Sequence, residues 1–391
     1  MARTATVTLL TSLDPLLRES VLARLRVDRP ELTVLRHDLD LVATEGVVVR
    51  RVVTGTTVTE HRLPLSAGCC LTCLVREDVL DVARSGIADE LVAVVPSALD
   101  PLPFAMLLAH AGEHDVEEGH ATLGPLARVV AVVRAAALER MLRSAGPPDP
   151  LSVEGIDADL ETSELLLRQL EHADVVLHDR TDTRSAMLIA SLADTARCLP
   201  LDVDPHRWTE RRPGEQGGWR PGGLRERAHM APVSSGGIAH ARWYRRRPLH
   251  PARLAEAIDH GVLGGVLRAR GFVWVASRPG AVLEVSIAAE TCMLGAIDTW
   301  LDPLSDDLEV PDVPPCPALD VGGRRVEWHP YYGDRFQLLS LVCDAEQLED
   351  VLAELEGCLL TDAELSEGPA AWRRIEDPLV GSDDAGPEAQ P

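Results

Sequence analysis

Short apolar runs alternate with amphipathic segments over the first 200 residues of the chain. Runs of β-branched and aliphatic residues, each the length of a buried strand, occupy residues 5–10, 32–35, 46–53, 90–95, 127–133, 174–178 and 198–203. Helix-like spacing separates several of them, at residues 15–26, 76–84, 135–143, 161–171 and 185–196. Apolar strands separated by helices are typical of a largely parallel sheet covered on both faces. The pattern predicts an N-terminal α/β domain, with an antiparallel hairpin inserted at residues 49–63.

The alternation stops at a segment without periodicity and then resumes in a second domain. Residues 204–237 are dense in Gly, Pro, Arg and Trp, a composition that indicates a linker. Beyond it the pattern predicts strands mixed with helices, including two strands around a turn at residues 278–280. We predict an α/β domain at residues 1–204, a linker at 205–236, a smaller α+β domain at 237–365 and a disordered acidic tail at 366–391.

The net charge of the chain argues against one class of binding partner, nucleic acid. The chain has 62 acidic and 38 basic residues, and its net charge of −24 opposes direct binding to a nucleic-acid backbone. All of these 38 basic residues are arginine, so no lysine exists to serve a phosphate-binding loop or a Schiff base. We expect a protein partner and no direct contact with nucleic acid.

The sequence shows neither a basic, apolar leader nor an apolar run long enough to span a membrane. We therefore expect a cytoplasmic protein without membrane contact. Thiols stay reduced in the cytoplasm, so the eight cysteines are not interpreted as a disulfide framework.

Three cysteines gather in the stretch SAGCCLTCLVRED, residues 66–78. A C-x2-C pair such as Cys70 and Cys73 can bind one zinc ion, because a tight turn brings both thiolates to one centre. The helix expected after them would lower a thiol pKa through its N-terminus. A redox dithiol has the same spacing but normally follows the first strand of a small fold, and cysteines also fill turns as small hydrophobes. We predict zinc binding through Cys70 and Cys73, with Cys69 as a substitute ligand.

Histidines offer weaker candidates for metal binding. His110 and His114, at i, i+4 spacing, would share one helical face and add zinc ligands, with His120 close by. The glycines among them favour a solvated loop instead, and we predict a loop. His250 stands alone, which favours a hydrogen-bonding or capping role over metal ligation. Trp274, in an alternating apolar strand, is predicted to lie in the core.

The first strand–helix turn, at residues 9–20, is the place where an α/β domain would hold a phosphate. A phosphate loop needs glycines that let backbone N–H groups approach the anion, and then a lysine and a Ser or Thr for magnesium. This turn has no glycine and no lysine, and Asp14 adds a negative charge at the start of the helix. We interpret the turn as structural.

The thiol stretch and the second domain resemble the CobW-like, zinc-associated GTPases. The hallmark of that family is a Gly-Cys-x-Cys-Cys run followed by Thr-x-Arg-x-Asp-Leu. Cys70 falls on the first cysteine position of this run, Thr72 on the middle one and Cys73 on the last. Arg76 and Asp78 fall on the matching arginine and aspartate. Residues 244–254, 265–279, 333–342 and 355–365 resemble the family's C-terminal domain. The resemblance implies a P-loop-GTPase-like sheet, a CobW C-terminal α+β domain, and Zn²⁺ with GTP and Mg²⁺ as cofactors.

The nucleotide motifs of the family are eroded in this chain. Residues 10–20 lack the glycines, the lysine and the Ser/Thr pair of the phosphate loop. Pro96 and Ser97 stand where the family has an acidic Walker-B-like glutamate. The guanine-reading Asn-Lys-x-Asp corresponds to residues 179–182, Asp-Arg-Thr-Asp, in which only Asp182 matches. The resemblance thus makes Asp182 a cofactor-binding candidate, whereas the lost motifs predict weak or absent GTP hydrolysis.

An abbreviated C-x2-C motif beside a degenerate phosphate loop is similar to an actinobacterial branch of the family. That branch implies a zinc-responsive protein that brings a ribosome hibernation factor to ribosomes under zinc limitation, with the factor or ribosomal proteins as partners. The family also implies an alternative, a GTP-dependent metallochaperone that delivers zinc to a client protein. The retained thiols suit both functions, and the eroded motifs favour recruitment.

Overall fold

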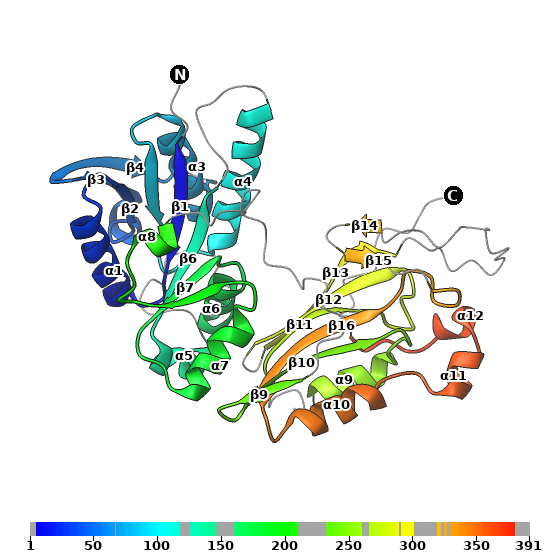
Figure 1. The fold of residues 1–391 in the computed structure, drawn as a ribbon. Coiled ribbons are helices and arrows are strands. Elements are labelled where there is room, and N and C mark those ends of the chain that lie inside the picture. The colour runs from blue at the N-terminus through cyan, green and yellow to red at the C-terminus, as the bar shows by residue number, and fades with distance from the viewer. Residues whose placement is uncertain are drawn as a thin grey trace. The chain divides into compact units, whose positions relative to one another are not determined.

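A computed structural model describes residues 5–66, 68–117, 126–144, 146, 160–209, 232–259, 266–288, 291–300, 319–321, 324–326 and 329–379. The chain divides into two compact units, Met1–Gly223 and Leu224–Pro391, shown in Figure 1. The predicted domain bounds at residues 204 and 237 stay predictions.

The first unit is built on an eight-stranded sheet with the strand order β4-β3-β2-β5-β1-β6-β7-β8 (Figure 1). Its strands are β1 (Thr6–Thr11), β2 (Thr33–Asp38), β3 (Val47–Thr54), β4 (Thr57–Pro64), β5 (Glu90–Val94), β6 (Arg128–Val133), β7 (Val175–His178) and β8 (Arg197–Pro200). Pairings from β2 across to β8 are parallel. Only the β3–β4 hairpin and its pairing with β2 are antiparallel. The largely parallel sheet and the inserted hairpin are therefore confirmed.

Both faces of this sheet are covered, as the apolar strands require. Side chains alternate across a strand, and β1 divides accordingly: Leu9 packs in the core that includes α3 and α4, whereas Leu10 packs with α1 on the opposite face. The helices of the unit are α1 (Pro15–Asp28), α2 (Val42–Glu45), α3 (Leu71–Arg84), α4 (Pro101–Glu117), α5 (Leu138–Leu142), α6 (Thr162–Glu171), α7 (Thr183–Leu192) and α8 (His206–Thr209), with a 3₁₀ turn at Ala135–Ala137.

Two sequence predictions in this unit are wrong. Helix α3 begins at Leu71, five residues before the predicted start, because the side chain of Cys70 caps it. His110 and His114 lie in α4 and not in a loop. The buried side chains of Phe104 and Leu108 hold that helix against the core, which outweighs the low helix propensity of its glycine. His120 lies outside the described residues.

The predicted linker is partly structured at its beginning. Helix α8 lies within it, and Trp208 is only 2% exposed because it packs in the same core as Leu22 and Leu25 of α1. Residues 210–231 lie outside the part of the chain that the structure describes.

The second unit is a six-stranded antiparallel sheet of order β13-β12-β11-β16-β10-β9. Its strands are β9 (Val233–Ser235), β10 (Ile238–Arg245), β11 (Val266–Val273), β12 (Ala281–Ala288), β13 (Thr291–Thr299) and β16 (Gln337–Asp344), and β14 (Leu319–Val321) pairs separately with β15 (Arg324–Val326). Helices α9 (Pro251–Asp259) and α10 (Leu348–Gly357) lie on one face of the sheet (Figure 1). The predicted α+β architecture is confirmed.

The opposite face of that sheet carries an aromatic core. Trp274 is 1% exposed, as predicted, and packs with Phe272, Phe336 and Trp372. Trp372 belongs to α12 (Pro369–Trp372), which follows α11 (Asp362–Ser366). Residues 366–379, predicted to be disordered, are instead attached to the sheet, because Trp372 is buried and Asp377 accepts a hydrogen bond from Ser277 at 2.6 Å.

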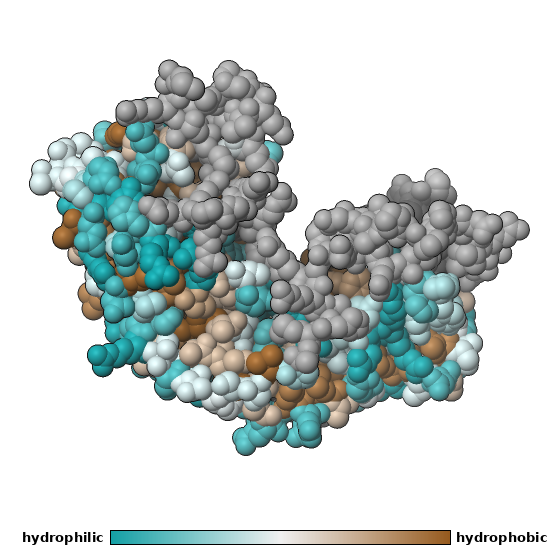
Figure 2. All heavy atoms as spheres, in the orientation of Figure 1, coloured by the Kyte–Doolittle hydropathy of each residue, from teal (hydrophilic) through white to brown (hydrophobic). Residues whose placement is uncertain are grey.

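On the face that Figure 2 shows, brown apolar residues are interspersed with teal polar ones over both units. In the portion that the structure describes, no helix is both long and apolar enough to cross a membrane.

Candidate functional site

The three clustered cysteines lie where the chain passes from β4 into α3. Gly68 adopts a left-handed φ of 84°, a conformation that glycine takes at little cost and that lets the chain turn before the helix. Cys70 is the N-cap of α3, and its sulfur accepts a hydrogen bond from the backbone N–H of Cys73 at 3.2 Å. The sulfur of Cys69 donates to the carbonyl oxygen of Cys70 at 3.5 Å. We call these three residues the thiol turn.

The thiol turn is accessible to solvent. Cys70 is exposed, Cys69 and Cys73 are half-buried, and all three are free thiols. By contrast, burial raises the pKa of Cys343 and of Cys358 to about 11, so both of these thiols stay protonated at neutral pH. Among the cysteines that the structure describes, the thiol turn therefore gathers three accessible thiols, whereas Cys343 and Cys358 are inert in the core of the second unit.

The expected lowering of a thiol pKa is not found at Cys73. Its pKa is raised, first by the hydrogen bond with the side chain of Cys70, and then by burial and by the negative charge that Cys70 would carry; Arg76 opposes this shift. The Cys73 thiol therefore holds its proton more tightly, because the neighbouring Cys70 sulfur accepts a hydrogen bond from the protonated form.

The donor chemistry of the thiol turn fits zinc in part. Cys70 and Cys73 offer two soft sulfur donors at one end of a helix, which zinc accepts in its tetrahedral sites. Within the residues that the structure describes, no group of three or more His, Cys, Asp or Glu side chains is arranged to hold a metal ion. Cys70 and Cys73 would thus supply two ligands, and water or another protein would complete the coordination.

The histidine candidates lie apart from this arrangement. The rings of His110 and His114 meet edge to face with centroids 6.4 Å apart, on α4. His250 lies at the start of α9, where its backbone oxygen accepts from Leu254 and its Nε2 is 4.0 Å from a carboxylate oxygen of Glu364. Burial lowers the pKa of His250, so its ring is neutral at pH 7. Its hydrogen-bonding role stays a prediction for the side chain.

A buried polar cluster behind α3 anchors the helix that carries the thiol turn. Asp78 accepts from Nη1 of Arg50 in β3 at 2.7 Å, and its other oxygen is 2.8 Å from Nε2 of His37 in β2. Asp78 and His37 are both buried. The sequence pointed to Asp78 only through the family motif, and its partners His37 and Arg50 were missed, because strand partners far apart in the chain leave no local signal.

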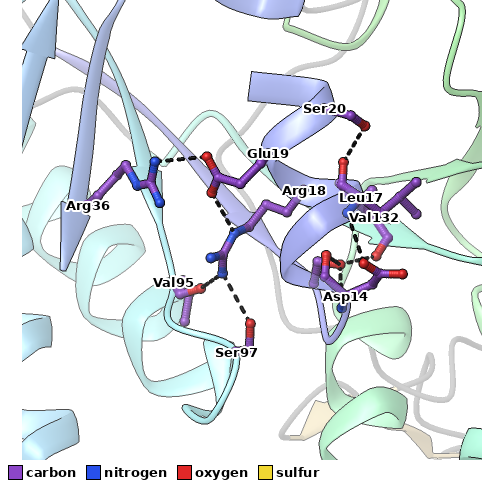
Figure 3. Close-up of polar contacts among 10 residues, drawn as sticks. Asp14, Leu17, Arg18, Glu19, Ser20, Arg36, Val95, Ser97 and Val132 are labelled. Atoms are coloured by element: carbon purple, nitrogen blue, oxygen red, sulfur yellow. Dashed lines mark hydrogen bonds and ion pairs between the residues drawn. The ribbon is translucent and has the colours of Figure 1, made fainter. Parts of the chain in front are cut away.

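The turn between β1 and α1 is closed by the chain's own carboxylate (Figure 3). Asp14 caps α1 by accepting from the N–H of Leu17 at 2.9 Å, and Nε of Arg134 donates to its other oxygen at 2.7 Å. Burial alone would raise the pKa of Asp14, but the hydrogen bonds from Leu17 and Arg134 outweigh it and the pKa is lowered. The N–H of Asp14 itself donates to the hydroxyl of Ser12 at 3.0 Å. Donors that a phosphate loop would offer to an anion are therefore already used.

Arg18 fills the space beside this turn. Its side chain runs from the first turn of α1 to the end of β5, where Nη1 donates to the Ser97 hydroxyl at 3.2 Å and to the Val95 carbonyl at 3.4 Å (Figure 3). Arg18 is buried, and Glu19 lies between it and Arg36, to which Glu19 pairs at 2.8 Å. Arg18 was not among the predicted site residues, because an arginine on a helix face is usually a solvated charge.

Asp182 has a local structural role in the first unit. It is the N-cap of α7, and its Oδ1 accepts from the N–H of Ser185 at 2.7 Å. That backbone hydrogen bond lowers the pKa of Asp182. The carboxylate is thus engaged by its own helix, and its guanine-reading role stays a prediction.

Comparison with known proteins identifies similar chains. Residues 238–359 match the family described as "Cobalamin synthesis protein cobW C-terminal domain". "Zinc-regulated GTPase metalloprotein activator 1" of Dictyostelium discoideum is 26% identical over 337 residues, which are 79% of this chain and 68% of that protein. "Zinc chaperone Rv0106" of Mycobacterium tuberculosis is 27% identical over 373 residues, which are 90% of this chain and 87% of the relative.

A solved structure of similar sequence span is the Zn(II)-bound YjiA GTPase from E. coli. It is 15% identical, covers 91% of this chain and 99% of its own, and superposes with a TM-score of 0.35. At that TM-score the likeness supports no conclusion about this chain.

Proposed function

We propose that this chain, which belongs to the CobW-like family, is a zinc-handling protein that holds the ion at Cys70 and Cys73 and acts on another protein without turning over nucleotide. One contrast between two helix starts supports the proposal. The start of α3 presents free thiols, whereas the start of α1 is closed by Asp14 and Arg18. On this proposal, the family's metal chemistry is retained at the start of α3, whereas its nucleotide chemistry is lost at the start of α1.

Two thiols with open coordination positions suit transient holding better than a closed structural site. A structural zinc site has four protein ligands, whereas an ion held by two thiolates exchanges its remaining ligands. Cys70 is exposed, so a partner protein can reach the ion. The names of the two relatives, a zinc-regulated GTPase metalloprotein activator and a zinc chaperone, support a zinc-related role.

The carboxylate of Asp14 opposes nucleotide binding at the β1–α1 turn. A nucleotide phosphate placed there would be repelled by the Asp14 carboxylate, whose lowered pKa keeps it ionised. The phosphate would also compete with that carboxylate for the donors on Leu17 and Arg134. The chain has no lysine for a phosphate loop, and the two arginines at this turn, Arg18 and Arg134, are engaged by Ser97 and Asp14. The function therefore rests on binding and not on GTP hydrolysis.

The partner proposed first is a ribosome hibernation factor, which this protein would bring to ribosomes in the cytoplasm under zinc limitation. The resemblance to the branch with an abbreviated thiol motif supports this partner. The net charge of −24 opposes a direct grip on ribosomal RNA, so the contact would be made through the factor or through basic ribosomal proteins.

The second candidate is delivery of zinc to a client protein, as a metallochaperone. The two-thiol site favours it, because ligands that leave the coordination sphere incomplete allow direct transfer to a client's thiols or histidines. The names of both relatives also favour it. In this form the chain would need no ribosomal partner.

The zinc content of purified protein tests the common part of both candidates. Wild-type protein reconstituted with zinc and freed of excess should retain about one ion per chain, and the Cys70→Ser/Cys73→Ser variant should retain far less. Cys198→Ser is the matched control, since it removes one exposed thiol outside the thiol turn and should leave the content unchanged. Equal zinc in all three proteins would refute the site.

Affinity capture from zinc-starved cells separates the two partners. Wild-type bait should retain the hibernation factor or ribosomal proteins if recruitment is correct, and ribonuclease treatment should not release the factor, because RNA is not the contact. A single zinc enzyme without ribosomal proteins would replace recruitment with delivery.

A further inference from the structure

Cys70 and Cys73 are placed for bonding to each other as well as to a metal. Cys70 is the N-cap of α3 and Cys73 lies in its first turn, with the Cys70 sulfur 3.2 Å from the Cys73 amide nitrogen. Helical positions three apart have Cα atoms about 5 Å apart, within the span of roughly 4.4–6.8 Å that a disulfide bridges. The Cα spacing of the two residues therefore suits a disulfide.

Cys69 is directed differently from this pair. Its sulfur donates to the carbonyl oxygen of Cys70 at 3.5 Å, and it precedes the helix. Among the described cysteines, Cys343 and Cys358 are buried in the second unit, and both have pKa values raised to about 11. Within the thiol turn, geometry thus selects the pair Cys70 and Cys73.

The body of α3 can stay in place while its first turn reacts. Leu71, Val75 and Val79 are each no more than 2% exposed, and Asp78 joins the helix to β2 and β3. Only the sulfur atoms at the exposed end need to move. A bond formed there and later reduced would therefore leave the fold unchanged.

We propose that the thiol turn is an oxidation site, at which Cys70 and Cys73 form a reversible disulfide by exchange with a low-molecular-weight disulfide. The exposed Cys70 thiolate attacks one sulfur of that reagent, whose S–S bond breaks and releases one small thiolate. The Cys73 thiolate then attacks the Cys70 sulfur of the mixed disulfide, forms the Cys70–Cys73 bond and expels the second small thiolate. The protein loses two electrons and two protons, and the reagent gains both as two thiols.

Oxidation at this site would discharge zinc, a consequence that rests on the proposed function. Zinc binds the thiolate form of cysteine, and a sulfur in a disulfide no longer carries that charge. One disulfide uses the sulfurs of both predicted ligands, Cys70 and Cys73, so the zinc ion loses both of these ligands at the same time. Reduction by a dithiol would restore the site, which makes zinc holding dependent on the thiol–disulfide balance of the surroundings.

The test uses full-length reduced protein, free of metal, incubated with hydroxyethyl disulfide. All three cysteines of the thiol turn lie in the tryptic peptide 63–76, which ends at Arg76. We expect this peptide to lose about 2 Da, with the bond assigned to Cys70 and Cys73 by fragmentation, and dithiothreitol to reverse the loss. Cys69→Ser should still form the bond, whereas Cys70→Ser and Cys73→Ser should not. Failure of the wild type to form it, or its loss in Cys69→Ser, would overturn the proposal.

A second measurement separates this proposal from the zinc function. Zinc-loaded protein is oxidised, and released ion is followed with a chromophoric chelator; release should match disulfide formation mole for mole. Zinc retained by fully oxidised protein overturns the discharge. If reduced wild-type protein never binds zinc but forms the disulfide, the proposed function fails and the oxidation site stands. If it binds zinc and forms no disulfide, only the oxidation site fails.

Discussion

Single residues in this chain take their chemistry from their surroundings. Cys343 and Cys358 are held as thiols by burial, whereas Cys70 lies exposed at a helix start with its sulfur hydrogen-bonded to an amide. Arg18 and Asp14 are charged residues that could bind a ligand, but Arg18 is hydrogen-bonded to Ser97 and Asp14 is paired with Arg134. At the residue scale, identity sets what a side chain can do, and its neighbours decide what it does.

Glu364 gives a pH-dependent prediction at this scale. Its pKa is lowered to about 2, chiefly by the hydrogen bond from Arg253, whose two nitrogens lie 3.0 and 2.7 Å from its oxygens. A carboxylate with a depressed pKa stabilises the fold fully above its unfolded pKa, near 4.5, and loses that effect as pH falls toward 2. Glu364→Gln should therefore be less stable than wild type at pH 7, and the difference should shrink between pH 5 and pH 3.

Urea unfolding followed by tryptophan fluorescence at several pH values measures this effect. Glu367→Gln is the control, since Glu367 is exposed and lies three residues further along the chain. A stability difference between Glu364→Gln and wild type that does not change with pH would contradict the prediction.

At the scale of elements, the N-termini of three helices in the first unit differ in whether the capping side chain is also paired with a residue from another element. Asp14, Cys70 and Asp182 are all N-caps, of α1, α3 and α7, and each accepts a backbone N–H. Asp14 alone of the three also pairs with an arginine from another strand end, Arg134. The cap of α1 therefore joins β1 to the end of β6, and the cap of α3 leaves a reactive sulfur exposed.

Removing the α1 cap should destabilise the first unit. Asp14→Ala loses both the hydrogen bond to Leu17 and the pair with Arg134, which should lower the free energy of unfolding by about 1–2 kcal/mol. The measurement is chemical unfolding at pH 7. Asp182→Ala, an N-cap whose carboxylate is fully exposed, serves as the control and should cost less. An equal or larger loss for the control would show that the Arg134 contact contributes nothing.

The second unit extends beyond the segment that matches the family model. That match ends at residue 359, yet α11 and α12 continue the fold and Trp372 enters the aromatic core. The side chain of Trp372 donates to the carbonyl oxygen of Glu364 at 2.8 Å. This addition covers the sheet face that α9 and α10 leave open.

For the whole molecule, charge and the closed β1–α1 turn lead to one expectation about nucleotide. The chain has a net charge of −24 and no lysine, and Asp14 lies where a phosphate would bind. Calorimetric titration with GTP and Mg²⁺ should show no sub-millimolar binding, and phosphate release should not exceed a protein-free blank.

The same titration with the Asp182→Ala variant tests whether Asp182 contributes to nucleotide binding. If the wild type bound GTP and this variant bound it more weakly, the guanine-reading role of Asp182 would be supported and the loss of nucleotide chemistry refuted. We expect both proteins to give the same null titration.

The sequence by itself determined the features that depend on local pattern. Strands that are buried along their whole length, such as β6, require cover on both faces, so the largely parallel sheet followed from the apolar pattern. The alternating pattern also predicted the burial of Trp274, which directly follows β11. Spacing alone also predicted Cys70 and Cys73 as a pair that could bind one zinc ion, and the missing glycines and lysine in residues 10–20 argued against a phosphate loop.

Only the tertiary structure decided contacts between residues far apart in the chain. Asp14 meets Arg134, Arg18 meets Ser97, and His37 meets Asp78, each across 41 or more positions, and no periodicity reports such pairs. The structure also overrode local signals where burial offered more than propensity: α4 continues through its glycine, and Trp208 and Trp372 bring segments of loop-like composition into the cores. Local pattern indicates many of the strands and helices, whereas packing decides where they end, whether a segment such as the end of α4 is helical, and which side chains meet.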